Sequence, residues 1–136
     1  MDRLSPDRRA ANMRAIRAKD TAPEMEVRRL AHALGYRFRL HRRNLPGSPD
    51  LVFPRRRKVV FVHGCYWHRH AGCQFAYTPK SNADFWLQKF EGNQQRDQRA
   101  LDRLQEAGWD SLIVWECETR DRSLLAARLQ SFLGPR

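Results

Sequence analysis

The sequence predicts an α/β fold in which a mixed central sheet is flanked by helices. Two observations carry this prediction: several short runs are rich in β-branched residues, and longer segments repeat their apolar residues at helical spacing. The short runs are almost continuously apolar, which is typical of strands buried on both faces. With 136 residues, the chain is long enough for one domain with one modest core. No apolar run approaches the roughly 20 residues of a membrane span, which excludes a membrane protein.

The first elements in order are two helices and a strand. Ser5 and Pro6 are typical of a helix start, and a basic helix or arm follows to residue 18; the alternative is an unstructured tail. Thr21 and Glu24 have capping-box spacing, so a second helix begins there, and Gly35 ends it. Residues 36–41 alternate apolar and polar side chains, which predicts a half-buried strand. We therefore expect a basic arm over residues 1–20 and a single domain over residues 21–136.

The remaining elements are a hairpin, a long helix, a strand and a last helix. Residues 50–53 and 58–63 are the hairpin strands, and a turn centred near Arg56 would place residue 50 opposite residue 62. An irregular segment rich in Cys, His and aromatic residues follows to residue 80. The sequence then predicts a helix over 82–107 ended by Gly108, a buried strand over 110–116, and a helix over 122–133.

The net charge of +11 is unevenly distributed along the chain. Residues 1–43 hold 12 basic and 5 acidic side chains, and residues 44–75 hold 5 and 1. Residues 76–136 hold 9 of each, so the first half carries the whole excess. This asymmetry favours a polyanionic partner, above all a nucleic acid. The alternative is a soluble protein that is basic without such a partner.

Four residues with soft ligand atoms indicate a metal site: Cys65, His70, Cys73 and Cys117. The first three lie within nine residues, and the fourth follows the last predicted strand. Four sulfur and nitrogen ligands are what a tetrahedral structural zinc site requires. Three cysteines also cannot all pair within one chain, which favours a reducing compartment and metal over disulfides. The alternative is a set of buried thiols that bind nothing.

Two further groups of residues point to catalysis. At the hairpin end, the Asp50 carboxylate, the Val62 carbonyl and the His63 imidazole would meet, and oxygen ligands of this kind suit Mg²⁺. Asp50 alone is equally well explained as a turn or cap residue after a proline. On the long helix, Asn93 and Asp97 interrupt an apolar face. A histidine from the 63–70 segment would pair with Asp97 as a general base, unless this face turns toward water.

Large aromatic residues accompany these polar groups. Tyr66, Trp67 and Trp86 stand beside candidate metal ligands in a basic chain. Aromatic side chains near a basic surface can wedge between base pairs or stack on an unpaired base. Ordinary core packing is the alternative interpretation of all three.

Four sequence blocks, in order and correctly spaced, resemble the very-short-patch mismatch-repair endonucleases: residues 12–16, 45–50, 61–68 and 112–117. The resemblance extends from about Ser5 to Cys117. It implies a restriction-endonuclease-like fold with a Mg²⁺ site and a structural zinc. It also implies a nickase that acts on double-stranded DNA at T:G mismatches, the product of 5-methylcytosine deamination. An enzyme of the bacterial cytoplasm, associated with the nucleoid and followed by downstream repair proteins, is the corresponding expectation. A monomer is expected separately, because no predicted helix has a spare apolar face.

The resemblance also implies a role for each matching residue. Asp50, with the Val62 carbonyl, would bind Mg²⁺, and Glu24 would support that site through water. His68 would be the general base oriented by Asp97, and His63 would contact the scissile phosphate or metal-bound water. Zinc would be held by Cys65, His70, Cys73 and Cys117. DNA contacts would come from Met13, Tyr66, Trp67, Trp86, Lys89 and Asn93, the three aromatics as a wedge and the last two as readers of the mismatched pair.

Two other functions remain open at this point. A zinc-stabilised DNA-binding module without catalysis would explain the charge, the Cys and His cluster and the aromatics. A nuclease of the same fold with another mismatch or sequence specificity would explain the catalytic residues equally well.

Overall fold

A four-stranded mixed sheet forms the centre of the computed structural model, which describes residues 21–74, 76–77 and 79–135. The strands stand side by side in chain order, the first three antiparallel and the last two parallel. They are β1 (Arg39–Leu40), β2 (Leu51–Phe53), β3 (Lys58–His63) and β4 (Asp110–Trp115). The predicted mixed sheet is therefore confirmed.

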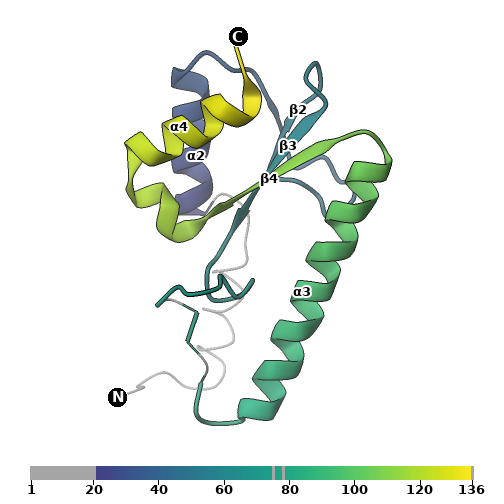
Figure 1. Cartoon of the computed structure of the whole chain (residues 1–136), viewed down its shortest axis with the longest axis vertical. Helices are drawn as coiled ribbons and strands as arrows, with labels where there is room; N and C mark the ends of the chain where they lie inside the picture. The colour runs from purple at the N-terminus through teal and green to yellow at the C-terminus, as the bar shows by residue number, and fades with distance from the viewer. Residues whose placement is uncertain (1–20, 75, 78, 136) are drawn as a thin grey trace.

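Helices cover both faces of this sheet (Figure 1). One face carries α2 (Ala22–Ala33) and α4 (Arg122–Leu133), and the other carries the long helix α3 (Ala83–Glu106). A short 3₁₀ helix, η1 (Glu116–Arg120), joins β4 to α4. The parallel pair β3 and β4 is connected through α3, as a parallel connection requires. Among the described helices, none is long and apolar enough to cross a membrane.

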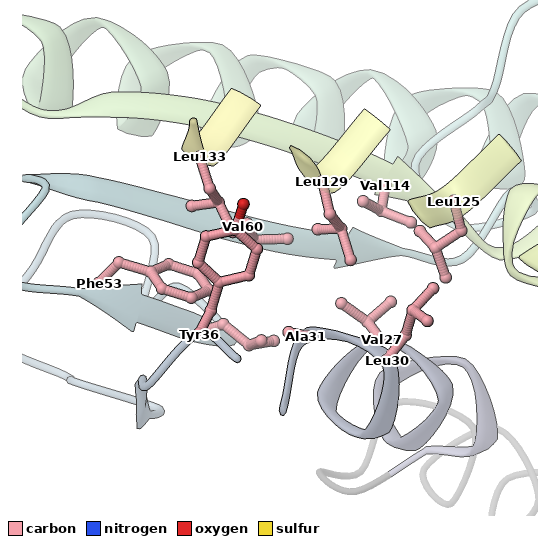
Figure 2. Close-up of a cluster of buried hydrophobic side chains, with 11 residues drawn as sticks. Val27, Leu30, Ala31, Tyr36, Phe53, Val60, Val114, Leu125, Leu129 and Leu133 are labelled. Carbon is pink, nitrogen blue, oxygen red and sulfur yellow. The ribbon is translucent and has the colours of Figure 1, made fainter. Parts of the chain in front are cut away.

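Alternation along the hairpin strands builds two cores. Leu51, Phe53 and Val60 pack with α2 and α4, together with Val114 of β4 (Figure 2). Their neighbours Val52, Val59 and Phe61 point to the opposite face and pack with Leu104 and Trp109 beside α3. Both faces of these strands are thus buried, which is why their sequences are continuous apolar runs.

The helix ends lie close to where the sequence places them. The Thr21 hydroxyl accepts a hydrogen bond from the Glu24 backbone N–H at 3.4 Å and caps α2. At the other end, Gly35 adopts a φ of +96°, a left-handed conformation that ends helices. Asp121 caps α4 in the same way as Thr21, through the Leu124 N–H at 3.1 Å. The predicted basic arm over residues 1–20 lies outside the described residues.

Two predictions about the strands need correction. The strand expected over residues 36–41 is reduced to Arg39–Leu40, and both residues are exposed rather than half-buried. At its start the Tyr36 N–H donates to the Ala31 carbonyl at 3.0 Å and closes α2, and at its end His41 takes a φ of +49° and leaves the extended conformation. The hairpin register is also shifted by one residue from the prediction. Leu51 pairs with Val60, which places residue 50 opposite residue 61 rather than 62, because the turn is centred between Arg55 and Arg56.

Three basic residues of the hairpin turn hold the ends of two helices. Arg56 Nη1 donates to the Leu133 carbonyl at 2.8 Å, and Lys58 Nζ donates to the Phe132 carbonyl at 2.5 Å, both in the last turn of α4. Arg57 Nη2 donates to the Ala107 carbonyl at 2.8 Å, at the end of α3. Cations there complement the negative end of each helix dipole. Part of the charge excess in the first half of the chain therefore has a structural use.

Candidate active site

A cleft of about 810 Å³ opens at the carboxyl end of β3, between the sheet, α3 and the start of α2. It brings together nine residues that the sequence pointed to: Glu24, Asp50, Val62, His63, Tyr66, Trp67, His68, Asn93 and Asp97. Its lining includes four carboxylates and one arginine, Arg96. This excess of acidic over basic side chains would repel a phosphate, so a phosphodiester substrate would need an added cation here.

Asp50 reaches Val62 through its side chain rather than through strand register. Its Oδ2 atom accepts a hydrogen bond from the Val62 backbone N–H at 2.6 Å. The pKa of the Asp50 carboxyl is raised to about 7. Burial is the main cause and nearby Glu24 adds to it, whereas the Val62 hydrogen bond opposes the shift. A nearby cation would stabilise the ionised form of this buried carboxyl. Its donor atoms are oxygens, the ligands that Mg²⁺ prefers, so they fit this ion.

Glu24, His41 and Asp50 form one compact group, with a ligand atom of each within 4.8 Å of the others. His41 Nε2 lies 3.6 Å from Glu24 Oε2, and His41 Nδ1 lies 3.9 Å from Asp50 Oδ1. Arg28, one turn along α2 from Glu24, contacts this group: its Nη2 atom lies 3.1 Å from Glu24 Oε2. Two carboxylates and an imidazole are thus held beside the cleft by α2 and the β1–β2 loop.

His68 and Asp97 meet as the helix pattern predicted. His68 Nδ1 lies 2.6 Å from Asp97 Oδ2, across the cleft between the loop after β3 and the middle of α3. The loop places His68 through a tight turn, in which the His68 N–H donates to the Gly64 carbonyl at 3.1 Å. Because a carboxylate only accepts, Nδ1 carries a proton, and in the neutral ring Nε2 then keeps a lone pair. The pair is therefore arranged to accept a proton from a reacting group.

His63 is buried and neutral. Its ring stacks on that of His68 with centroids 3.8 Å apart and meets Trp115 edge to face. Burial lowers the pKa of His63 to about 3, and the neighbouring His68 lowers it further. Its Nδ1 atom has no hydrogen-bond partner in the described part of the chain. The atom is also buried, so a group that enters the cleft reaches it only if neighbouring side chains move.

The four predicted soft ligands lie together beside the cleft. Cys65, His70, Cys73 and Cys117 have ligand atoms within 4.8 Å of one another, and no disulfide joins the cysteines. The His70 Nδ1 atom lies 3.7 Å from Cys65 Sγ and 3.4 Å from Cys117 Sγ. Ligands of one tetrahedral zinc stand roughly 3.5–3.8 Å apart, given Zn–S and Zn–N lengths of about 2.0–2.3 Å. The donor set and the spacing therefore fit zinc.

Several contacts hold this cluster in shape. The Cys117 backbone N–H donates to Cys65 Sγ at 3.4 Å, which links the loop after β3 to η1. The His70 ring stacks on Trp115 at the end of β4, with centroids 4.3 Å apart. Burial raises the pKa of the Cys65 thiol to about 12, so the thiol is protonated unless a metal ion is bound.

The candidate wedge residues form an aromatic cluster at the mouth of the cleft. Tyr66 contacts both Trp67 and Trp86, with centroids 4.9 and 6.5 Å apart. Trp67 is buried in the cluster, whereas Tyr66 and Trp86 are half-buried. The Lys89 ammonium lies over the rings of Trp67 and Trp86, and Phe85 beside Trp86 is 59% exposed. Part of this cluster is core, and part faces solvent.

Asn93 is buried, and both ends of its amide contact protein groups. Its Nδ2 donates to the Trp67 carbonyl at 3.2 Å, and its Oδ1 accepts from Arg96 Nη2. Asn93 therefore fixes the loop after β3 and orients Arg96 in the cleft. Met13, the remaining predicted DNA contact, lies outside the described residues.

Sequence reasoning missed four residues of the site: Arg28, His41, Arg96 and Glu116, whose carboxylate also lines the cleft. Arg28 had a usable signal, because it stands four residues after Glu24 on the same helix and such pairs face each other. His41 directly follows β1, which pairs with the start of β2, so its backbone N–H meets the Asp50 carbonyl. Arg96 precedes Asp97 on α3 and had no distinguishing pattern.

Comparison with known proteins gives consistent matches over nearly the whole chain. The family described as DNA mismatch endonuclease Vsr matches residues 1–74. The Type II nicking enzyme V.XorIIP of Xanthomonas oryzae is 54% identical over 134 residues, which cover 98% of each chain. The DNA mismatch endonuclease Vsr of Escherichia coli is 46% identical over 117 residues, 86% of this chain and 74% of that protein. The Type II nicking enzyme V.NmeAIP of Neisseria meningitidis is 37% identical over 128 residues, 94% of this chain and 91% of that protein.

Proposed function

Because this chain belongs to the Vsr family of DNA mismatch endonucleases, we propose that it nicks one DNA strand 5′ to the thymine of a T:G mismatch. The chain is a DNA endonuclease by this membership. Nicking rather than double-strand cutting is supported by relatives named nicking enzymes. The T:G mismatch is supported by the sequence blocks that resemble very-short-patch repair enzymes. Such a nick would begin repair of deaminated 5-methylcytosine in the cytoplasm, at the nucleoid.

The His68–Asp97 pair carries this proposal. His68 would take a proton from the attacking water through Nε2, while Asp97 holds the Nδ1 proton and stabilises the charged ring. His63, neutral and stacked on His68, would contact the scissile phosphate or its surrounding water through Nδ1. A DNA-binding module without catalysis would have no use for a half-buried proton acceptor held in this way by a carboxylate.

Asp50 would hold the catalytic divalent cation, with the Val62 carbonyl beside it and Glu24 in support. Magnesium bound there would stabilise charge on the phosphate and on the leaving 3′ oxygen. Two features support this assignment: the raised pKa of the buried Asp50 carboxyl, and the excess of carboxylates in a cleft that must receive a phosphate. The donor atoms are oxygens, as Mg²⁺ prefers.

The Cys65, His70, Cys73 and Cys117 cluster would hold a structural zinc ion. All four ligands come from the protein, so no position is left for a substrate. The ion would pin the loop that carries His68 to the end of β4.

A restriction-endonuclease-like fold is also proposed, because the mixed sheet carries the proposed catalytic residues at one end.

DNA would approach the cleft across the aromatic cluster. Tyr66, Trp67 and Trp86 would wedge beside the mismatch, with the half-buried Tyr66 and Trp86 as the first to touch bases. Lys89 and Asn93 would read the mismatched pair, Asn93 in concert with Arg96. Met13 and the basic arm would contact the duplex from the other groove.

A nicking assay on end-labelled duplexes tests the proposal. One duplex carries a single T:G pair and its control a T:A pair at the same place, each in several flanking sequences and with or without Mg²⁺. We expect a Mg²⁺-dependent cut in the thymine strand of the mismatched duplex alone. Asp50→Ala should abolish the cut and keep DNA binding, whereas Glu26→Ala, which removes an exposed carboxylate from α2, should change neither.

Each other outcome of this assay selects a different function. Cutting of both duplexes would keep the nuclease and discard mismatch specificity. Tight binding without a cut, in every flanking sequence, would favour the binding module. Loss of DNA binding together with activity in Asp50→Ala would contradict a purely catalytic role for this residue.

A further inference from the structure

A buried arginine lies inside the group of carboxylates that would bind the catalytic cation. Arg28 Nη2 is 3.1 Å from Glu24 Oε2 and 2.9 Å from His41 Nε2. The side chains of Arg28 and Glu24 are 12% and 8% exposed, so water screens their charges little. Arg28 is thus a fixed positive charge at the place where a positive ion is expected.

Hydrogen-bond direction fixes the state of the histidine between them. A guanidinium only donates, so His41 Nε2 must accept from Arg28 and carry a lone pair. The proton of the neutral ring then sits on Nδ1, which faces Asp50 Oδ1 at 3.9 Å. The His41 backbone N–H also points to the Asp50 carbonyl, at 3.4 Å. Arg28 therefore bonds directly to Glu24 and to His41, and the His41 ring lies 3.9 Å from the Asp50 carboxylate.

The charges explain why a cation belongs in this place. Glu24 and Asp50 each place a carboxylate oxygen in a group whose ligand atoms lie within 4.8 Å of one another. Two such charges repel each other unless a positive charge lies between or beside them. Arg28 supplies one such charge from within the chain, and Mg²⁺ would supply two from solution. The two cations then act on the same carboxylates and repel each other.

We infer that Arg28 is a tethered cation that shares the Glu24 and Asp50 carboxylates with the catalytic divalent ion, and that its charge weakens the binding of that ion. The inference rests on the proposed metal site at Asp50. It makes Arg28 a positioning residue, which keeps the carboxylates together before the ion arrives and sets the ion concentration at which the site fills.

Direct measurement of Mn²⁺ binding to the whole protein, without DNA, tests this role. Calorimetry and the electron paramagnetic resonance signal of free Mn²⁺ give the dissociation constant independently of activity. Arg28→Gln removes the charge and keeps an amide that can donate to Glu24 or His41. We expect it to bind Mn²⁺ more tightly, by roughly tenfold or more, because a like charge a few ångströms from the ion is gone.

Two controls separate charge from geometry. Arg28→Lys keeps the charge and alters the hydrogen bonds, so its dissociation constant should stay near that of the unmodified protein. Arg29→Gln removes the same charge from the next residue of α2, whose side chain is 65% exposed, and should change the constant by less than about twofold. Thermal melting of each variant verifies that it is folded.

The possible failures are distinguishable. If Asp50→Asn abolishes Mn²⁺ binding but a folded Arg28→Gln binds no more tightly than the unmodified protein, this inference is overturned and the metal site stands. Equal tightening in Arg28→Gln and Arg29→Gln would also overturn it, because the effect would then be one of net charge. If Asp50→Asn leaves Mn²⁺ binding unchanged, the proposed metal site falls, and the inference falls with it.

Discussion

The imidazole rings of His63 and His68 lie face to face, with centroids 3.8 Å apart and planes 11° from parallel. Two stacked rings at this distance cannot both be charged without strong repulsion. Burial keeps His63 neutral, and Asp97 holds a proton on Nδ1 of His68. This arrangement supports the proposed roles, in which His68 would exchange protons while His63 stays neutral beside it.

Removing the imidazole at position 68 should slow the reaction and leave the fold intact. For His68→Ala we expect a loss of roughly 10²–10⁴-fold in the single-turnover rate on a T:G duplex, the usual contribution of a general base. The side chain is only partly buried, so the melting temperature should change little. His32→Ala, at an exposed position near the end of α2, is the control. A near-normal rate in His68→Ala would exclude it as the base.

Asp50 makes the metal-free protein less stable as the pH rises. Its pKa is about 7 in the folded chain and 3.8 in the unfolded chain, so between these values the folded state binds more protons. The free energy of unfolding therefore falls with increasing pH across this window. Asp50→Asn, which is neutral, should unfold with a free energy on the order of 1–4 kcal/mol higher at pH 8, and the gain should shrink toward pH 4.

Denaturant unfolding of both proteins at a series of pH values, in buffer without added Mg²⁺, measures this difference. Adding Mg²⁺ at pH 8 should raise the melting temperature of the unmodified protein and leave that of Asp50→Asn unchanged. An Asp50→Asn protein that is less stable than the unmodified one at pH 8 would contradict the proposal that the charged carboxylate destabilises the metal-free fold.

Loss of one zinc ligand should destabilise the whole protein. In Cys117→Ala we expect the bound zinc, measured by atomic absorption, to fall from about one ion per chain toward none. The melting temperature should fall with it, and Cys73→Ala should give a similar loss because it breaks the same site. Without a metal, truncation of these partly exposed thiols would have a small effect. Unchanged zinc content and melting temperature in Cys117→Ala would therefore refute the zinc assignment.

Gly47 permits the loop before Asp50 to pack against α3. It has a φ of +75°, and an added Cβ would lie 2.8 Å from Ala100 Cβ and 3.1 Å from the Phe61 ring. Gly47→Ala should thus lower the free energy of unfolding by about 2–4 kcal/mol, through backbone strain and overpacking. It should also reduce the nicking rate, because this loop carries Asp50 into the cleft.

Gly92 provides the matched control for this substitution. It lies within α3, and outside the neighbouring helix backbone no atom lies within 4 Å of the place where its Cβ would stand. Gly92→Ala should stabilise the protein by about 0.5–1 kcal/mol, the usual gain for alanine in a helix interior. Urea denaturation of both variants measures the two effects. The prediction fails if the variants change stability in the same direction.

The order of elements and much of the cleft follow from sequence patterns alone. Capping by Thr21, the end of a helix at Gly35 and the interrupted face at Asp97 are local signals, and each one is matched in the structure. The shorter first strand had no such signal, because it ends where His41 adopts a left-handed conformation. The register differed because the turn holds four residues, 54–57, so its centre falls between Arg55 and Arg56, whereas a centre on Arg56 would need an odd number of turn residues.

The residues missed at the site share a physical reason. Arg28 and His41 acquire their roles only when the start of α2 is packed beside the end of β1. That contact depends on tertiary packing, whereas sequence patterns report mainly on neighbours within one element. Similarly, Arg56, Arg57 and Lys58 contribute to a charge excess that predicts a nucleic-acid partner, yet they bind carbonyl groups at helix ends.

Those three basic side chains also connect parts of the molecule that are distant along the chain. The hairpin turn, the end of α3 and the end of α4 share hydrogen bonds, so none of them can open without exposing the carbonyls or cations of another. The amide hydrogens of these three segments should therefore exchange with solvent as one cooperative unit, with a common free energy of opening. The cleft, at the other end of β3, is then free to fluctuate on its own timescale while this end of the molecule stays closed.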